Sequence, residues 1–524
     1  MGKRERKFAM IDTEVKFPRP GRTPREDTAA VMKFYRLPGE FPRAVLDEAR
    51  RMARPGAFPP GERLDLRRKF IFTCDPESAR DYDDALSVET DRAGRIVLGV
   101  HIADVSHYVR PGSALDREAY RRSNSVYFCD RVVPMLPELL SNGVCSLVPG
   151  EDRLAFSVFI TFDARGEMVA RRFAKSVICS RARFTYEEVM KVISGGRFPA
   201  GTPRIAEKTV RTVHALAQKL RARRFSAGAL DLEVAEVEAR LDADGELESI
   251  VSRPYDESHQ MIEECMVAAN EAVARELWPR GIRILARLHE PPDEEKLLTL
   301  RAELRGLGVK MGDISKPKVF AQFLRSIKSH PLYPTIAVMI LRSMKKAVYD
   351  ATTIGHFGLA KRYYAHFTSP IRRYPDLTLH RQLAAYLAAG RPGAPSPKVP
   401  PKQLARWAEH TSEMEQTAAE AERSLLEIKK YRLLDAELAA RVRTEYEAVI
   451  SRCLPFGCFV EIPALQASGL VHVSRLSRRF VRYNESDGTL SAAGGGRWRV
   501  GDKLKVKVVQ VDFENRRIDF IPCS

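Results

Sequence analysis

The sequence predicts an α+β protein of several domains: a short helical N-terminal region, a large mixed α/β domain and a small C-terminal β-barrel. Three observations predict this class. The chain has 524 residues, about the length of three or four domains. Strand-like and helix-like segments follow one another without segregation through the middle of the chain. Residues 441–524 hold short β-rich runs broken by Gly and Asp, as expected for one five-stranded barrel.

The composition is that of an ordinary globular protein with a strong basic excess. Hydrophobic residues make up 44% and charged residues 29%, which excludes a fibrous or wholly disordered chain. The formal net charge is +18, which favours polyanionic partners, nucleic acid ahead of an anionic membrane. Charge alone does not separate a nucleic-acid binder from a merely basic protein.

The cysteines and the N-terminus predict a cytoplasmic protein. The eight cysteines are scattered and contain no Cys-x-x-Cys pair, so neither a disulfide framework nor a zinc site is expected. The start, MGKRERKFAMIDTE, lacks the apolar core of a secretory signal. No run approaches the ~18 apolar residues of a membrane span, so we expect no membrane partner.

The first 64 residues predict an arm followed by two short helices. Residues 1–25 hold eight basic and three acidic side chains together with three prolines, and we expect a mobile arm. Helices are expected over Asp27–Tyr35 and Phe41–Arg54. The pair could form a unit like a helix-turn-helix or a plain connecting segment, and both interpretations stay open.

The middle of the chain mixes strands and long helices. Strands are expected over Arg68–Thr73 and Gly94–Ile102, which are rich in β-branched and aromatic residues. Apolar spacing predicts long helices over Ser258–Leu277 and Leu404–Leu434. The strongest linker signal is Arg391–Lys402, with five prolines in twelve residues, which could also be a surface loop between helices.

The segment most informative about chemistry is Cys74–Ala85, CDPESARDYDDA, which directly follows a predicted strand. Its like charges disfavour ionisation of one another, and a divalent cation removes that cost. Magnesium accepts a few carboxylates and takes further ligands from substrate phosphate. Two such ions about 3.5–4 Å apart can activate a water and stabilise a leaving oxygen. The pattern suggests metal-assisted phosphodiester hydrolysis by four aspartates, Asp75, Asp81, Asp83 and Asp84.

Two other interpretations of this segment compete with a metal site. A calcium loop of the EF-hand type would begin at Asp81 and place Leu86 where glycine is required, so it is excluded. An acidic surface turn or helix N-cap is the commonest role of an aspartate run. For an isolated segment of this kind that interpretation would be preferred, and it stays open on these residues alone.

Five further blocks follow this segment along the chain. They are VHIADVSHYVRPGSALDREA from Val100, SVYFCDRVVPMLPELLSNGVCSL from Ser125, MIEECMVAAN from Met261, LRSMKKAVYD from Leu341 and GHFGLAKRYYAHFTSPIRRYPDLTLHR from Gly355. Together, from about residue 65 to 435, these blocks resemble the ribonuclease II / ribonuclease R family of 3′→5′ exoribonucleases, the ribonuclease R branch more closely. The resemblance implies a catalytic domain of the ribonuclease II type over residues 65–440.

The resemblance implies roles for single residues of the acidic segment and of the block from Ser125. Asp75 and Asp84 match the direct magnesium ligands, and Asp81 completes the cluster. Asp83 matches the aspartate most closely tied to cleavage, through a second metal or the water. Tyr127 matches the tyrosine that clamps the 3′-terminal nucleotide, with plain core packing as the alternative.

Three more residues match positions that contact phosphate or ribose. Arg372 matches the arginine that holds the scissile phosphate, for which a planar guanidinium is suited; a structural ion pair is the alternative. Glu263 and Glu422 match carboxylates at the ribose end, where accepting from a 2′-hydroxyl would favour RNA. Both glutamates could instead be ordinary solvated helix residues.

Other residues of these blocks are expected to be structural or to depart from the family. We assign four histidines to packing and hydrogen bonding, because none lies at a ligand spacing from another: His101, His107, His356 and His366. Leu232 stands where the family often has an aromatic residue that completes the base clamp. A leucine would lose much of the roughly 1–3 kcal/mol of base stacking.

Residues 441–524 resemble the OB-fold RNA-binding barrel named after the first protein of the small ribosomal subunit. Phe456, Phe459 and His472 match its RNA-facing positions, and such barrels combine aromatic platforms with a basic groove. From Arg475 onward there are eleven Lys and Arg against six Asp and Glu. A charge-balanced β domain with buried phenylalanines is the alternative.

The N-terminal region departs from the family, whose members commonly carry two cold-shock barrels ahead of the catalytic domain. Only about 64 residues precede that domain in this sequence, too few for two such barrels. The resemblance therefore does not extend to behaviour on structured RNA.

The sequence thus predicts a processive 3′→5′ exoribonuclease that degrades single-stranded RNA to 5′-mononucleotides. We expect a monomer that uses one or two Mg²⁺ ions, with Mn²⁺ as a possible substitute. A catalytically inactive RNA-binding protein on the same fold is the alternative, which loss of metal ligands would favour. A DNA-directed nuclease is a third hypothesis.

Overall fold

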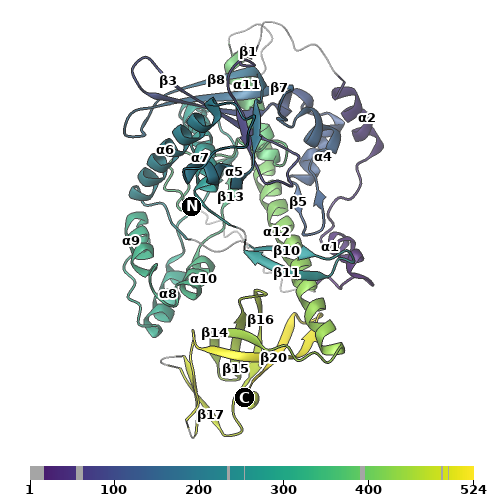
Figure 1. The fold of residues 1–524 in the computed structure, drawn as a ribbon, viewed down its shortest axis with the longest axis vertical. Helices are drawn as coiled ribbons and strands as arrows, with labels where there is room; N and C mark the ends of the chain where they lie inside the picture. The colour runs from purple at the N-terminus through teal and green to yellow at the C-terminus, as the bar shows by residue number, and fades with distance from the viewer. Residues whose placement is uncertain are drawn as a thin grey trace, which may run out of the picture. The chain divides into compact units, whose positions relative to one another are not determined.

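The computed structural model describes residues 17–54, 63–232, 237–252, 254–389, 396–485, 488–493 and 495–523. The chain forms two compact units (Figure 1). The larger unit comprises residues 37–238 and 251–420, and the barrel unit comprises residues 1–36, 239–250 and 421–524. The predicted domain boundaries at residues 64 and 440 divide the chain differently and stay a prediction.

A seven-stranded mixed sheet is the centre of the larger unit. Its strand order is β1-β8-β7-β4-β3-β2-β9; β3, β4, β7 and β8 pair antiparallel, whereas β1 with β8 and β2 with β9 pair parallel. The predicted strands are confirmed in place, with bounds shifted by up to four residues. The bounds are β1 Leu64–Asp65, β2 Phe72–Cys74, β3 Asp84–Thr90, β4 Ile96–Ala103, β7 Asp152–Phe162, β8 Met168–Cys179 and β9 Ala182–Phe184.

One face of this sheet packs on helices to form the main core. Leu98, Val100 and Ile102 alternate along β4 and are fully buried against α5–α7. The helix starts are encoded locally: Thr185 and Glu188 form a capping box on α5, and Asp256 caps α7. The predicted helix Ser258–Leu277 is confirmed. The bounds are α5 Tyr186–Ile193, α6 Ile205–Ser226, α7 Glu257–Leu277 and α11 Tyr374–Ala388.

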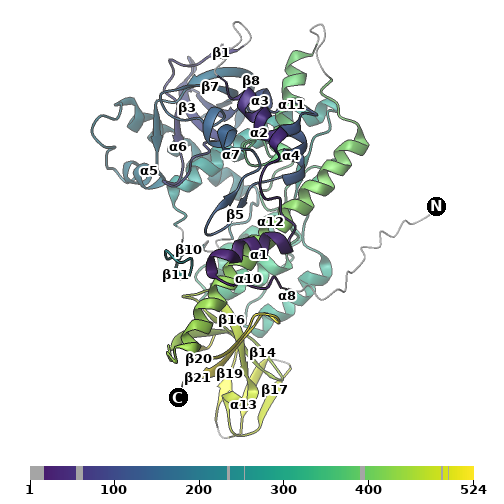
Figure 2. The same cartoon turned by 90° about the vertical axis from the view of Figure 1, so that its right-hand side faces the viewer.

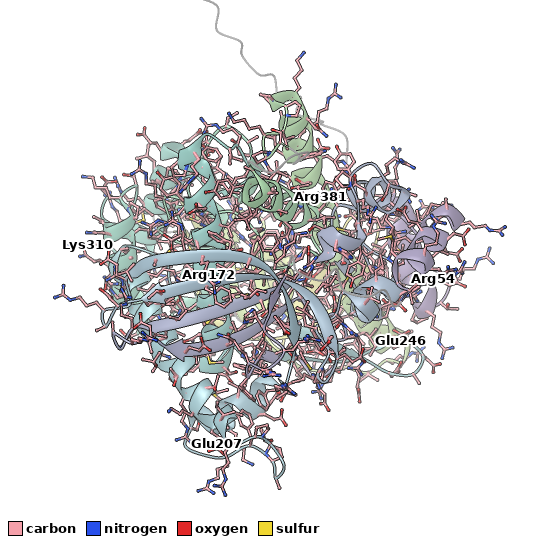
Figure 3. All side chains as sticks on the ribbon, turned by 90° about the horizontal axis from the view of Figure 1, so that it is seen from above. Arg54, Arg172, Glu207, Glu246, Lys310 and Arg381 are labelled. Carbon is pink, nitrogen blue, oxygen red and sulfur yellow. The ribbon has the colours of Figure 1, made fainter. Side chains whose placement is uncertain are left out.

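The opposite face is partly covered and partly lined by charged side chains. Small residues such as Ala85, Ala103 and Ala155 lie in a second core to which α2 and α4 contribute. Farther along the same face, the guanidinium carbon of Arg172 lies 4.3 Å from the ring centroid of Phe159. Arg172 is labelled on this sheet in the view from above (Figure 3). The elements are α2 Arg43–Met52, α3 Val105–Tyr108, α4 Ala114–Arg122, β5 Val126–Tyr127 and β6 Val132–Val133.

A separate helical cluster and two short sheets complete the central part of the chain. Leu300, Leu304 and Phe320 are buried in the core that α8, α9 and α10 share. These elements are α8 Glu294–Gly306, α9 Pro317–Ile327, α10 Tyr333–Ser343, β12 Ala286–Leu288 with β13 Val348–Asp350, and β10 Val237–Leu241 with β11 Leu247–Ser252. Among the described residues, no helix is both long enough and apolar enough to cross a membrane.

The C-terminal residues form the predicted five-stranded barrel, closed in the order β14-β15-β16-β21-β20. Gly457 lies at φ +154°, and a Cβ there would approach the Val471 carbonyl oxygen to 2.3 Å, so only glycine fits this hairpin. The barrel strands are β14 Tyr446–Leu454, β15 Gly457–Ile462, β16 Ala467–His472, β20 Lys503–Asp512 and β21 Arg517–Pro522. The insertion between β16 and β20 holds α13 Val473–Leu476, β17 Val481–Asn484, β18 Thr489–Ala492 and β19 Arg497–Trp498 (Figure 2).

All eight cysteines lie in the part of the chain that the structure describes, and none forms a disulfide. Cys453 and Cys458 face each other across β14 and β15 with their sulfur atoms 3.3 Å apart.

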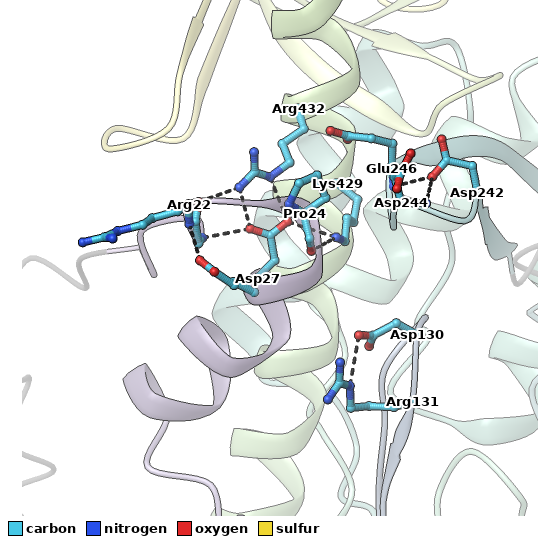
Figure 4. A network of polar contacts seen from close by, with 12 residues as sticks. Arg22, Pro24, Asp27, Asp130, Arg131, Asp242, Asp244, Glu246, Lys429 and Arg432 are labelled. Carbon is cyan, nitrogen blue, oxygen red and sulfur yellow. Dashed lines mark hydrogen bonds and ion pairs between the residues drawn. The ribbon is translucent and has the colours of Figure 1, made fainter.

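A buried ion pair fixes the N-terminal segment within the barrel unit (Figure 4). Helix α1 (Asp27–Phe34) begins at a fully buried aspartate. Asp27 accepts from Lys429 Nζ at 3.0 Å and from Arg432 Nε at 2.8 Å, both on α12 (Pro401–Ala439). Phe17 is also buried, 5% exposed. The predicted mobile arm is therefore wrong for residues 17–25, while residues 1–16 lie outside the described part.

We expect Asp27→Ala to lower the free energy of unfolding of the barrel unit by about 3–5 kcal/mol, because it leaves two buried cations without their counter-charge. Scanning calorimetry would measure the shift of that transition. The matched control is Asp47→Ala, which removes an exposed carboxylate 2.7 Å from Arg50 and costs at most about 1 kcal/mol. Equal effects of the two substitutions would contradict the assigned role of the ion pair.

Candidate active site

The aspartate segment is held at the end of two neighbouring strands. Asp75 directly follows β2, and Asp84 begins β3, its antiparallel neighbour. The backbone is fixed at both ends, because the Asp75 amide donates to Phe184 O at 3.1 Å and the Ala103 amide donates to Asp83 O at 2.9 Å. The loop between them therefore has little freedom to move its carboxylates into solvent.

Asp83 is the most enclosed of the four carboxylates, 4% exposed. Its Oδ1 accepts from the Ile371 amide at 2.9 Å, and its Oδ2 lies 3.7 Å from Arg372 Nε. Within the described residues, Oδ2 has no hydrogen-bond partner. Burial raises the pKa of Asp83 well above its usual range, although Arg372 and the Ile371 amide oppose that shift.

Asp75 and Asp84 form a second centre of uncompensated negative charge. Burial, reinforced by the charge of Asp84, raises the pKa of Asp75 to about 8. Burial also raises the pKa of Asp84 to about 6, against the opposing charges of Arg372 and Arg373. Both shifts have the direction expected for carboxyls that are costly to ionise together, and the metal site itself stays a prediction. The interpretation as an acidic surface turn does not fit, because such a turn would leave its carboxylates solvated.

Tyr127 lies on β5 with its hydroxyl directed at the aspartates. The hydroxyl donates to Asp81 Oδ2 over 3.5 Å, a long contact. Loss of hydration, with Asp81 and Asp83 nearby, raises the pKa of Tyr127 above its ordinary value. The residue is 42% exposed, so the alternative of plain core packing is wrong and its ring is accessible to a partner.

The structure separates the two neighbouring arginines of the Arg372 segment. Arg373 donates to Asp376 at 2.8 Å and serves as the structural ion pair. Arg372 keeps a side chain that is 44% exposed, and its Nη2 donates to Ser369 Oγ at 3.1 Å. The Ser125 amide donates to Arg372 O at 3.1 Å, which ties this loop to the chain leading to Tyr127.

The donor set fits a hard divalent cation on chemical grounds. Among the described residues, no three His, Cys, Asp or Glu side chains gather closely enough to hold a metal ion. The buried oxygens Asp75 Oδ2 and Asp83 Oδ2 nevertheless have no hydrogen-bond partner in that part of the chain. Carboxylate oxygens are the ligands that Mg²⁺ prefers, and a cation would offset the raised pKa values. The full set of four aspartates stays a prediction.

Glu263 lies on the first half of α7 and is held from two sides. Arg224 Nη2 donates to its Oε1 at 3.0 Å, and the Tyr255 hydroxyl donates to its Oε2. The carboxylate is 33% exposed, so it is oriented and still accessible. Its predicted contact with ribose stays a prediction.

Sequence reasoning missed an aromatic group beside Glu263. Tyr186 stacks on His259 with ring centroids 3.9 Å apart and planes at 14°. His259 and Glu263 lie four residues apart on one side of α7. Tyr255, two residues before the helix, joins them through its hydroxyl contact with Glu263. That spacing is a signal the sequence carried. The contribution of Tyr186, from α5, depends on tertiary packing and had no sequence signal.

The remaining assigned residues of the blocks lie as follows. His101 is fully buried and bonds to Ser87 and Ser157, as predicted for a packing residue. Glu422 is half-buried on the part of α12 that belongs to the barrel unit, and its role stays a prediction. Leu232 packs against the core shared by α8, α9 and α10. The other three histidines, His107, His356 and His366, have lowered pKa values because of burial.

The barrel brings its three predicted RNA-facing residues to one end of β15 and β16. Phe456 is 46% exposed and meets Phe459 edge-to-face at 6.2 Å. His472 is exposed and pairs in register with Gly457, next to Phe456. The alternative of buried phenylalanines is therefore wrong for Phe456.

The buried acidic loop beside an exposed arginine, together with a separate OB-fold barrel, defines a nuclease-type architecture. The RNB domain family matches residues 63–389 and the S1 RNA binding domain family matches residues 440–521. The chain belongs to the ribonuclease R family of RNB-domain exoribonucleases.

Relatives in bacteria support this membership. The chain is 40% identical over 529 residues to ribonuclease R of Thermotoga maritima, covering 97% of this chain and 74% of that protein. It is 38% identical over 469 residues to ribonuclease R of Escherichia coli, covering 87% of this chain and 57% of that protein. The chain thus spans between 57% and 74% of the length of these two relatives.

Solved structures of ribonuclease R and of a related pseudonuclease have the same fold as this chain. Ribonuclease R of Mycoplasma genitalium, in complex with ribose-methylated single-stranded RNA, has a TM-score of 0.86 at 28% identity and covers 96% of this chain and 78% of its own. A yeast pseudonuclease shares the fold with a TM-score of 0.69 at 19% identity, covering 90% of this chain and 58% of its own. The fold alone therefore does not determine turnover.

We expect the stability of the protein in EDTA to fall as the pH rises from about 5 to about 8. Asp75 and Asp84 have folded-state pKa values of about 8 and about 6, above the unfolded value of about 3.9. Their contribution to stability is therefore full below the unfolded pKa and is lost as the pH rises through the folded values. Thermal unfolding across that pH range measures the fall.

Asp75→Asn removes one of these titrations and should make the fall in stability with rising pH shallower. The control is Asp91→Asn, in an exposed turn where hydrogen bonds from Arg95 and Ala93 lower the pKa of the carboxyl. That substitution should leave the fall in stability with rising pH unchanged. A pH profile identical in wild type and Asp75→Asn would contradict the raised pKa of Asp75.

Proposed function

We propose that this protein is a processive 3′→5′ exoribonuclease that hydrolyses single-stranded RNA to 5′-mononucleotides in RNA turnover. It acts as a monomer in the cytoplasm, a reducing compartment consistent with eight cysteines that form no disulfide. The observation that carries the proposal is the placement of buried Asp83 Oδ2 3.7 Å from the exposed side chain of Arg372. The exposed guanidinium offers positive charge to a phosphate, beside a carboxylate that a bound cation would neutralise.

The four aspartates would hold one or two Mg²⁺ ions, or Mn²⁺ in their place. When bound, such a cation lowers the pKa of a water and stabilises the oxygen that leaves. The chain prepares this site by fixing Asp83 Oδ1 with the Ile371 amide, which leaves Oδ2 to orient the attacking water. The aspartates would carry their charge in full only when a bound cation offsets their burial.

Arg372 binds the terminal phosphodiester and sets the position of cleavage. Its guanidinium presents several N–H donors in a plane, and two of them match two phosphate oxygens. Because Ser369 holds one Nη, the remaining donors are directed rather than free to rotate. The guanidinium also opposes the raised pKa of Asp83 and Asp84, which couples phosphate binding to the charge of the acidic loop.

Tyr127 and Glu263 select the 3′ end of RNA. The accessible ring of Tyr127 stacks on a terminal base, an interaction that tolerates any sequence. Glu263 accepts a hydrogen bond from a 2′-hydroxyl, which DNA lacks, and its orientation by Arg224 and Tyr255 prepares it for this contact. In the barrel, Phe456, Phe459 and His472 form the platform along which the strand binds.

The alternative is a catalytically inactive RNA-binding protein on the same fold. Four aspartates in an enclosed loop argue against it, because burying carboxylates without a partner costs free energy that a binding role alone does not require. Binding of RNA without any product at long incubation would support that alternative. Competition between RNA and DNA of one sequence separates the third hypothesis, a DNA-directed nuclease.

With 5′-labelled single-stranded RNA and Mg²⁺, we expect the full-length band to convert to a short labelled end product, and EDTA to abolish the reaction. Asp83→Asn should remove turnover and leave RNA affinity within about twofold, because the amide keeps the shape and loses the charge. Asp91→Asn, with the same change of charge at an exposed turn, is the control. Internal cuts, full activity in EDTA or wild-type rates in Asp83→Asn would contradict the proposal.

Arg372→Lys should lower the turnover number about 10²-fold, because an ammonium cannot replace the fork of donors on the phosphate. Single-turnover kinetics with excess enzyme separate this effect from RNA binding. The matched control, Arg92→Lys, changes an exposed arginine of the β3–β4 turn and should keep the wild-type rate. An unchanged turnover number in Arg372→Lys would contradict the proposed role of Arg372 in binding the phosphate.

A further inference from the structure

The insertion between β16 and β20 presents the most exposed large apolar side chain of the described residues. Phe480, directly before β17, is 81% exposed. Its carbonyl accepts from the Ala493 amide at 3.2 Å, so its backbone continues the pairing of β17 with β18. The ring is therefore held on an ordered strand end rather than on a loose loop.

The inner face of this small sheet packs on the barrel core, which defines its outer face. Tyr483, Leu490 and Trp498 are directly paired across β17, β18 and β19 and belong to the barrel core or pack against it. Residues one position away point to the other side. In register, that outer row is Arg482, Ser491 and Arg497, and all three are exposed.

The outer face is basic as well as aromatic. The segment from Val473 to Asn484 contains four arginines and no acidic residue. Arg478 and Arg482 flank Phe480 and are exposed. Within the part of the chain that the structure describes, neither guanidinium forms an ion pair or a side-chain hydrogen bond, whereas Arg479 donates to the Ala493 carbonyl at 3.3 Å.

We propose that Phe480, Arg478 and Arg482 form a second single-stranded RNA contact of the barrel, separate from the platform of Phe456, Phe459 and His472. A base stacks on the Phe480 ring, and the two guanidinium groups bind the phosphates on either side of it. An exposed aromatic ring between cations that form no ion pair with any described residue is the arrangement that binds a flexible polyanion with flat bases.

The geometry distinguishes this surface from ordinary surface charge. Exposing the Phe480 ring to water is unfavourable in free energy, and no packing in the free protein offsets it. The backbone of Phe480 is nevertheless fixed by β pairing. The sheet that carries it projects from the barrel next to β14 (Figures 1 and 2) and turns its apolar side inward, so the ring is not part of the core. The inference rests on the proposed RNA-degrading function.

The experiment measures RNA affinity of the full chain by fluorescence anisotropy, in an Asp83→Asn background, over a series of salt concentrations. Phe480→Ala should weaken binding about fivefold or more, and Phe480→Tyr should keep wild-type affinity because the ring remains. Arg478→Gln with Arg482→Gln should reduce the slope of log affinity against log salt by about 1.4, since each phosphate contact contributes about 0.7 on a single strand.

The matched control removes two charges elsewhere: Arg92→Gln with Arg165→Gln, both in exposed turns of the larger unit, should leave the slope unchanged. Thermal unfolding midpoints of all variants should match the parent protein, because the altered side chains are exposed. Weaker RNA binding without a change in the salt slope in the double arginine variant would overturn the proposal. An equal loss of RNA affinity in Phe480→Ala and Phe480→Tyr would overturn it as well.

Failure of the second RNA contact and failure of the proposed function give different results. Wild-type affinity and slope in every variant, while the wild-type enzyme degrades RNA, would overturn the second contact and leave the proposed function intact. A wild-type chain that neither binds nor degrades RNA would overturn the proposed function itself. Loss of sedimentation with phosphatidylserine–phosphatidylcholine vesicles in the variants, with RNA binding unchanged, would assign the surface to a membrane instead.

Discussion

The central constraint on this structure is negative charge enclosed where water cannot solvate it. The acidic loop is fixed at both ends by backbone hydrogen bonds to the sheet, so its carboxylates cannot relieve their repulsion by turning outward. Asp83 receives one amide hydrogen bond and Asp75 is destabilised by Asp84, and burial holds the pKa of each carboxyl above its usual range. In the free protein these carboxyls are therefore harder to ionise than exposed ones, and only positive charge beside them would favour their charged forms.

The surrounding parts are arranged around that constraint. The four-strand antiparallel core of the sheet gives the acidic loop a rigid base, since β3 and β4 are backed by the buried face of α5–α7. Of two adjacent arginines, Arg373 is paired with the buried Asp376, whereas Arg372 lies 3.7 Å from Asp83 and keeps a side chain that is 44% exposed. Glu263 is likewise held in position and accessible, because Arg224 and Tyr255 orient its carboxylate while it still reaches solvent.

Much of this was predictable from the sequence, and the exceptions share one physical cause. The strand before Asp75, the helix ending at Leu277 and the five-stranded barrel depend on local periodicity and turn residues, and these were predicted within a few positions. What failed depended on contacts between distant segments: residues 17–25 resemble a disordered arm in composition, yet Asp27 pairs with Lys429 about four hundred positions away. Which arginine of a pair is buried has no local signal either.

The pairing of Asp27 with Lys429 and Arg432 also bears on how the protein can be trimmed. A chain shortened past residue 36 would keep both cations on α12 and lose the carboxylate that lies between them. The surface left behind would hold the charges of Lys429 and Arg432 beside the Tyr431 ring that Phe17 now contacts. Affinity tags and fluorescent fusions should accordingly be attached upstream of this segment. Removing the segment would expose a basic and apolar surface that binds nucleic acid non-specifically.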